Sequence, residues 1–276
     1  MKIVQISDTH LSRLGGTTND NFVALAAYIN EVLRPDAVVH TGDIAIMDPD
    51  QAEDRAAAKA LLAAIEAPLH VLPGNHDIGD SAQPWVVSSD RVRAFTEVHG
   101  PDHWVEIVGD VALVGLDSEI LGSGLPEEEA QWAWLETVPE QVGGRRALVF
   151  CHKPLVDPDP AATHPMSIPA DAVPRLRAAL GRIDVAAYGS GHLHRYLLER
   201  DGDAWAVSAP AVAFTAGSAA DYPGLRQLGL VEYEITADAV VPTFRSIHTL
   251  VERDLMDLPE ARRALEEAGI MLPASA

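Results

Sequence analysis

The chain has 276 residues, of which 47% are hydrophobic, 22% are charged and only 5% are aromatic. This composition excludes a disordered or fibrous protein, and the length is enough to bury a sizeable core without disulfides. The 41 acidic residues outnumber the 20 Lys and Arg residues and give a formal net charge of −21 at pH 7. Such a surface repels nucleic acids, anionic membranes and phosphates, so a phosphate substrate needs a local source of positive charge.

Cysteine content and hydropathy bear on the compartment. Cys151 is the only cysteine, which excludes an internal disulfide and fits a reducing environment. The N-terminus runs directly into an apolar segment without the pattern of a secretory signal, and no stretch reaches the roughly 18 apolar residues of a membrane span. We therefore expect a cytoplasmic protein with no membrane partner. Its oligomeric state stays open, with a homo-oligomer among the alternatives.

Short β-rich apolar runs alternate with helical patterns through the first two thirds of the chain. Strands are predicted at residues 3–6, 37–39, 69–72, 105–108, 111–116, 147–151 and 185–188. Helices are predicted at residues 22–33, 51–65 and 173–180, and another begins at Pro126. Gly109-Asp110 between two of the strands is a hairpin signature.

The pattern changes after His194, where four strands follow one another at residues 196–199, 204–208, 228–235 and 240–247. A closing meander of this kind favours two sheets over one doubly wound sheet, within an α/β chain. We expect a catalytic domain over residues 1–250 and a C-terminal tail over residues 251–276. Residues 154–169 form the longest irregular stretch, and long loops in compact domains are usually functional.

Five polar clusters lie where a predicted strand gives way to a loop. They are Asp8-Thr9-His10, Gly42-Asp43, Gly74-Asn75-His76-Asp77, His152 and Gly191-His192-Leu193-His194. Residues two apart on an extended segment point the same way, so the paired members of a cluster can reach one point together. Imidazole and carboxylate groups that converge from a rigid scaffold are what metal binding requires. The glycines leave room beside the backbone for tight turns and for a metal or substrate.

All five clusters, in this order, resemble the signature of the calcineurin-like metallophosphoesterases over residues 1–250. The motif order and the length resemble the branch that contains class III cyclic nucleotide phosphodiesterases and bacterial glycerophosphodiesterases. The resemblance implies a four-layer αββα sandwich, in which helices flank two central mixed sheets. It also implies a dinuclear metal site at the ends of the strands.

The same resemblance implies a role for each motif residue. One metal ion would be held by Asp8, His10 and His194, and the other by Asn75, His152 and His192. Asp43 would bridge both ions, and this donor set suits Mn, Fe, Zn or Co. His76 would contact the phosphate and assist the leaving oxygen as a catalytic residue. Asp77 would support it by a hydrogen bond that fixes its tautomer. Asn75, His76 and His164 are the candidates for substrate binding.

Several other residues match no motif and receive structural interpretations. His40, His70, His99, His103 and His248 are expected to be structural or solvated. Cys151, Trp132 and Trp134 are expected to pack in the core. Lys153 follows His152 at a position where many relatives have a second histidine, and solvation is favoured over contact with a phosphate. A supporting role for Asp117 at the site is left open.

The expected function is hydrolysis of a small phosphodiester, either a cyclic nucleotide or a glycerophosphodiester, by in-line attack of a metal-bridging hydroxide. A phosphomonoesterase or diphosphate hydrolase on the same site is the alternative. A catalytically inactive interaction scaffold is disfavoured, because His76 and all seven ligand positions are present. A nuclease acting on polymeric nucleic acid is disfavoured by the negative charge.

Overall fold

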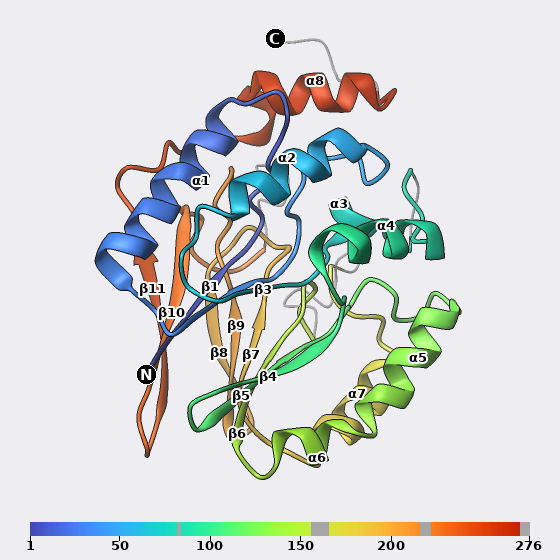
Figure 1. Cartoon of the computed structure of the whole chain (residues 1–276), viewed down its shortest axis with the longest axis vertical. Coiled ribbons are helices and arrows are strands. Elements are labelled where there is room, and N and C mark those ends of the chain that lie inside the picture. The colour runs from blue at the N-terminus through green and yellow to red at the C-terminus, as the bar shows by residue number, and fades with distance from the viewer. Residues whose placement is uncertain (82–83, 156–165, 216–221, 271–276) are drawn as a thin grey trace.

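A computed structural model describes residues 1–81, 84–155, 166–215 and 222–270 of the chain, and its centre is a pair of β-sheets (Figure 1). The first sheet has the strand order β11-β10-β1-β2-β3, and the second has the order β4-β5-β6-β7-β9-β8. The strands of the first sheet are β1 (Lys2–Ile6), β2 (Ala37–His40), β3 (Leu69–Val71), β10 (Gly229–Ile235) and β11 (Val240–Ser246). Those of the second are β4 (Trp104–Val108), β5 (Val111–Gly115), β6 (Arg146–Phe150), β7 (Asp184–Ser190), β8 (Leu197–Asp201) and β9 (Ala204–Ser208).

Helices cover the outer faces of both sheets. They are α1 (Thr17–Tyr28) with a π-helical extension (Ile29–Leu33), α2 (Ala52–Leu62), α3 (Asn75–Ile78), α4 (Ser89–His99), α5 (Pro126–Leu135), α6 (Val138–Val142), α7 (Val173–Leu180) and α8 (Pro259–Glu267), with a 3-10 turn at Leu255–Asp257. In Figure 1, α1, α2 and α8 lie on one side of the molecule and α5, α6 and α7 on the other. The short α3 and the longer α4 were not predicted, because α4 buries only Val92 and Phe95 and its apolar stripe is short.

Three apolar cores hold the four layers together. Alternation along β1 places Ile3 between the two sheets, whereas Val4 and Ile6 face the first helical layer. Phe22 and Leu25 of α1 recur at helical spacing and pack on that same face. On the opposite side, Trp132 packs with other residues of α5, α6 and α7 against the second sheet. The predicted four-layer sandwich of two mixed sheets is therefore confirmed.

The last four strands do not form one meander as predicted. Strands β8 and β9 pair antiparallel within the second sheet, and β9 also pairs parallel to β7. Strands β10 and β11 pair antiparallel at the edge of the first sheet, beside β1. The two hairpins separate because each extends a different sheet, and local strand patterns carry no information on which distant strand is the partner.

The segment after residue 250 packs on the rest of the molecule. Leu258, Ala261 and Ala264 lie in an apolar cluster with Met47 and Phe214, which belong to loops beside the strand ends. Glu260 of α8 is buried and accepts a hydrogen bond from the backbone N–H of Thr18 at 3.3 Å. The domain boundary expected at residue 250 stays a prediction. No helix in the described ranges combines the length and the apolar character that crossing a membrane requires.

Strand direction explains where a site can form. β1, β2 and β3 run parallel to one another, as do β5, β6, β7 and β9. Their carboxyl ends therefore meet at one edge of each sheet, and the loops that leave this edge can bring distant residues together. Ligands of open α/β sheets bind beyond the carboxyl ends of the strands.

Candidate metal centre

The polar clusters follow the carboxyl ends of parallel strands. Asp8 and His10 come after β1, Asp43 after β2 and Asn75 after β3. His152 follows β6 of the second sheet, and His192 and His194 follow β7. Each of these loops leaves a strand that neighbours another motif-bearing strand. The topology thus gathers residues up to 186 positions apart, from Asp8 to His194, in one place.

A first group of ligand atoms consists of Asp8, His10 and His194, all three of them buried. Their candidate ligand atoms lie within 4.8 Å of one another. His194 Nε2 is 3.3 Å from His10 Nε2 and 3.3 Å from Asp8 Oδ1. The resemblance assigns these residues to one metal ion.

A second group consists of Asp43, His152 and His192, with candidate ligand atoms again within 4.8 Å of one another. His152 Nε2 lies 3.1 Å from His192 Nδ1 and 3.1 Å from Asn75 Oδ1. Asp43 faces both groups, because its Oδ1 is 3.5 Å from His152 Nε2 and its Oδ2 is 3.8 Å from His10 Nε2. This placement is the one a bridging carboxylate needs.

Hydrogen bonds to backbone carbonyls fix the tautomers of two imidazoles. His152 Nδ1 donates to the carbonyl of Thr41 and His194 Nδ1 to that of Phe214, each at 2.8 Å. A carbonyl oxygen can only accept, so Nδ1 carries a proton and Nε2 of each ring points into the cluster. Such an outer hydrogen bond is the usual way in which a metal-ligating histidine is oriented.

The electrostatics of the cluster favour a cation at its centre. Burial alone lowers the pKa of His152, but the carboxylate of Asp43 reverses this effect and raises the pKa to about 10. Burial lowers the pKa of His10 to about 3, so that ring is neutral. Although burial raises the pKa of Asp8, the imidazole of His194 more than compensates, and the carboxyl is ionised. Ionised carboxylates beside imidazole nitrogens in a buried site fit one or more divalent ions, which would displace the proton from Nε2 of His152 on binding.

The backbone is strained at five of the candidate ligands. Asp8, His10, Asp43, His192 and His194 have positive φ angles of 54°, 44°, 54°, 66° and 52°. Only two further non-glycine residues in the described ranges, Arg34 and Met47, share this feature. A left-handed residue with a side chain costs free energy, and such residues cluster at functional sites. The tight turns at the strand ends are therefore kept despite their conformational cost.

Gly74 lets two motif loops approach each other closely. A Cβ atom at this position would overlap with the Oδ1 and backbone N of Asp43, and it would lie 2.8 Å from Cε1 of His152. Its φ of −114° is open to any residue, so close approach is what requires glycine here.

His76 lies beside both groups. Its backbone N–H donates to Asp43 Oδ1 at 2.8 Å, and its Nδ1 donates to the carbonyl of Met47 at 2.7 Å. The ring makes edge contacts with those of His10 and Trp85, at centroid distances of 5.2 and 5.8 Å. His76, Asn75 and His192 are half-buried, whereas the other candidate ligands are buried, so the cluster is open to solvent on their side.

Asp77 supports the site differently from the way the sequence suggests. In the described part of the chain it makes no hydrogen bond with His76, whose tautomer depends on Met47 instead. Its buried carboxylate accepts hydrogen bonds from the backbone N–H groups of Ile44, Ala45 and Gly74 at 2.9–3.1 Å. Burial and the nearby Asp43 carboxylate raise the pKa of Asp77 to about 6. Asp77 thus joins the loop after β2 to the loop after β3.

The prediction of a solvated Lys153 is wrong. The side chain is only 7% exposed, and its Nζ lies 2.6 Å from Asp80 Oδ1 and 2.9 Å from Glu119 Oε2. Residues on three different loops meet in this ion cluster. Nothing in the local sequence around position 153 signals it, because the two acids lie 34 and 73 positions earlier in the chain.

The remaining candidates fall into three situations. Asp117 is buried but accepts a hydrogen bond from the backbone of Glu119 and belongs to neither ligand group. His40 is buried and structural, because it accepts from the N–H of Gly42 and contacts Thr9 Oγ1 at 2.8 Å. His164 lies outside the described residues. Phe214, which the sequence did not single out, stacks on His10 at a centroid distance of 4.6 Å.

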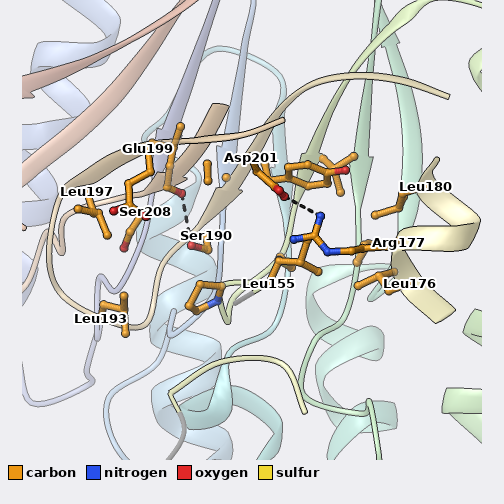
Figure 2. A pocket seen from close by; sticks show the side chains of 18 of the residues that line it. Leu155, Leu176, Arg177, Leu180, Ser190, Leu193, Leu197, Glu199, Asp201 and Ser208 are labelled. Atoms are coloured by element: carbon orange, nitrogen blue, oxygen red, sulfur yellow. Dashed lines mark hydrogen bonds and ion pairs between the residues drawn. The ribbon is translucent and has the colours of Figure 1, made fainter. Parts of the chain in front are cut away.

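A separate cavity of about 260 Å³ lies next to α7 and strands β7, β8 and β9 (Figure 2). Its lining is mainly apolar, with the 2.8 Å ion pair between Arg177 and Asp201 among its polar groups. Of the described residues that line it, none is a candidate metal ligand. The cavity is therefore distinct from the site at the strand ends.

Two groups of candidate nitrogen and oxygen ligands at the strand ends of an αββα sandwich are the arrangement expected of a metal-dependent hydrolase. Residues 1–196 match the family described as calcineurin-like phosphoesterase. The chain belongs to this family, and the resemblance seen in the motifs is confirmed. It is accordingly a metal-dependent phosphoesterase.

Named relatives are consistent with this assignment. The chain is 30% identical over 213 residues to a probable glycerophosphodiester phosphodiesterase of Arcobacter nitrofigilis, which covers 71% of this chain and 72% of the relative. It is also 30% identical over 206 residues to a cAMP/cGMP dual specificity phosphodiesterase of Mycobacterium tuberculosis, covering 70% of this chain and 61% of that protein. A dimetal phosphatase from Danio rerio shares the fold, with a TM-score of 0.60, 16% identity and coverage of 91% and 97% of the two chains.

Proposed function

We propose that the chain hydrolyses small phosphodiesters, with a cyclic nucleotide or a glycerophosphodiester as substrate. The observation that carries this proposal is the pair of ligand groups that share Asp43, with the half-buried His76 beside them. The two named relatives act on substrates of these two kinds according to their names. The net charge of −21 supports a small substrate over a nucleic acid polymer.

The proposed cofactor is a pair of divalent ions, with Mn, Fe, Zn and Co as the candidates. Asp8, His10 and His194 would hold one ion, and Asn75, His152 and His192 the other, with Asp43 between them. When bound, such a pair supplies positive charge to the phosphate and lowers the pKa of water. The cytoplasmic location and the oligomeric state stay predictions.

His76 is the proposed proton donor to the leaving oxygen. Its Nδ1–H is held by the carbonyl of Met47, so the proton for the leaving oxygen would come from Nε2 of the doubly protonated ring. The contact with Asp43 through the backbone N–H holds the residue beside the shared carboxylate. Asn75, which is half-buried on the same side, is proposed to contact the substrate together with His76. A contribution of His164 to substrate binding also stays a prediction.

A substrate panel tests the function. We expect bis(p-nitrophenyl) phosphate, cyclic AMP or glycerophosphocholine to be hydrolysed faster than p-nitrophenyl phosphate, after loading with Mn, Zn or Mg. Treatment with a chelator should abolish the activity, and the metal should restore it. Faster hydrolysis of the monoester would instead favour the phosphomonoesterase alternative.

The role of His76 is tested by varying the leaving group. General acid assistance is typically worth about 10²–10⁴-fold in rate. We expect His76→Ala to keep its bound metal and to lose this factor with alkoxide leaving groups, as in a cyclic nucleotide. The loss should be much smaller with p-nitrophenolate, which hardly needs a proton. An equal loss with both classes would assign His76 to phosphate binding.

A further inference from the structure

We propose that Lys153 is a positioning residue, whose ammonium group fixes Asp80 and thereby holds Trp85 against His76. This inference rests on the proposed function, in which His76 gives a proton to the leaving oxygen. Lys153, Asp80 and Glu119 are called the lysine clamp below. None of these three residues lies in the two ligand groups.

The lysine is fixed at both ends. Its Nζ is 2.6 Å from Asp80 Oδ1 and 2.9 Å from Glu119 Oε2, and the side chain is 7% exposed. Its backbone N–H donates to Ser118 Oγ at 2.9 Å, and its carbonyl accepts from the thiol of Cys151 at 3.0 Å. A buried ammonium group committed to two carboxylates has little freedom to reach a phosphate, so a direct contact with substrate is disfavoured.

Backbone hydrogen bonds connect Asp80 to the segment that carries Trp85. The N–H of Asp80 donates to the carbonyl of Trp85, and the carbonyl of Asp80 accepts from the N–H of Val87, both at 2.7 Å. The preceding Gly79 also lies close to the backbone of Trp85, since a Cβ there would be 2.8 Å from the carbonyl oxygen of Trp85. A displacement of Asp80 must therefore displace the backbone of Trp85.

Trp85 is one of the contacts that orient His76. The two rings meet edge to face, at a centroid distance of 5.8 Å and an interplanar angle of 68°. The other contacts are the carbonyl of Met47 at 2.7 Å and the ring of His10 at 5.2 Å. Loss of the indole would remove one of these three contacts, and the direction of Nε2 would then be less tightly defined.

Charge balance gives the clamp a second effect on the same turn. The Asp80 side chain is 32% exposed. Lys153 offsets part of the negative charge of Asp80 and Glu119, which would otherwise repel an anionic substrate more strongly. The same ion pair therefore fixes the turn and lowers its negative charge.

The test uses Asp80→Ala, because this variant keeps the buried pair of Lys153 and Glu119. A second variant, Lys153→Met with Glu119→Gln, removes the clamp without leaving a lone buried charge. Glu136→Ala is the matched control, since it breaks an ion pair with Arg182 on the exposed surface of the opposite helical layer. The first readout is the indole ¹H–¹⁵N resonance of Trp85 in the metal-loaded protein, assigned with Trp85→Phe.

We expect both clamp variants to shift or broaden the Trp85 indole resonance and to keep the metal content of the wild type. With an alkoxide leaving group their kcat should fall about 10- to 100-fold, the scale of a misplaced catalytic group. KM should change by less than about twofold, because no binding group is lost. The loss should be smaller with p-nitrophenolate, and Asp80→Ala added to Trp85→Ala should cost nothing further.

Two outcomes overturn the inference. An unchanged indole resonance would show that the clamp does not position Trp85. A loss expressed mainly in KM, or through reduced metal content, would assign the clamp to substrate or metal binding instead. If the metal-loaded wild type hydrolyses no phosphodiester, the proposed function fails, and the indole resonance alone then decides whether the clamp positions Trp85.

Discussion

A methyl group at position 74 should damage the metal centre more than the fold. In the Gly74→Ala variant the new Cβ would overlap with Asp43 and lie 2.8 Å from Cε1 of His152. Ordinary carbon contacts begin near 3.5 Å, so the His152 ring must retreat by about 0.7 Å and the Asp43 carboxylate by more. The φ of −114° adds no backbone strain, so the effect is confined to these contacts.

Movements of this size exceed what a metal site tolerates, because ligand distances must be correct to within about 0.2 Å. Changes that disturb the orientation of ligands typically cost about 10–100-fold in metal affinity. The overpacking itself should lower the free energy of unfolding by about 1–3 kcal/mol. We therefore expect weak metal binding in a protein that still folds.

Titration of the chelator-treated protein with Mn²⁺, followed by calorimetry, measures the affinity, and urea unfolding measures the stability. Gly181→Ala is the control, since its φ is −65° and its added Cβ would meet the carbonyl oxygens of Arg177 at 3.0 Å and Ala178 at 3.9 Å, far from the candidate ligands in the chain. Activity of Gly74→Ala should recover in part at high metal concentration. Wild-type affinity for both ions in Gly74→Ala would refute the reasoning.

Two further outcomes can be measured on the same protein. Asp43→Asn should reduce turnover more than His10→Ala, because a neutral side chain between the two ligand groups weakens both of them at once. Similar turnover in the two variants, at saturating metal, would contradict a bridging role for Asp43. Burial raises the pKa of Asp117 well above its ordinary value, so this carboxyl holds its proton more tightly in the folded state than in the unfolded chain. Stability is therefore lost as pH rises above the ordinary carboxyl range, and Asp117→Asn should be more stable than the wild type in urea unfolding at pH 7, with a gain that shrinks toward pH 4. A gain that does not change with pH would mean that ionisation of Asp117 is not its cause.

The sequence predicts the site better than it predicts the surroundings of the site. Asp8 and His192 could be placed at strand ends because apolar runs followed by Gly, Asp and His are visible locally, and parallel strands share an edge. The sheet to which each closing hairpin belongs is decided by pairing with β1, 226 to 232 positions away, and with β7, 18 positions away. Such pairing leaves no local trace.

Backbone carbonyls and buried ion pairs were also beyond sequence reasoning. Thr41, Met47 and Phe214 hold the imidazoles through their carbonyls, which every residue possesses. The sequence alone predicts that Lys153 lies on the surface, because the fold, and not the local sequence, brings Asp80 and Glu119 to it. Asp77 was expected to hydrogen-bond with His76. Its carboxylate instead accepts from backbone N–H groups, because the side chain faces the loop after β2.

The left-handed backbone at the candidate ligands has a consequence for directed evolution. A non-glycine residue in this conformation costs about 1–2 kcal/mol, and Asp8, His10, Asp43, His192 and His194 all adopt it. Glycine at any of these positions would relax the chain while removing a metal-binding group. A screen for heat resistance in chelator is therefore expected to enrich substitutions that abolish activity, whereas the same library screened with metal present keeps the ligands. Thermostable catalysts of this fold should be selected with the metal bound.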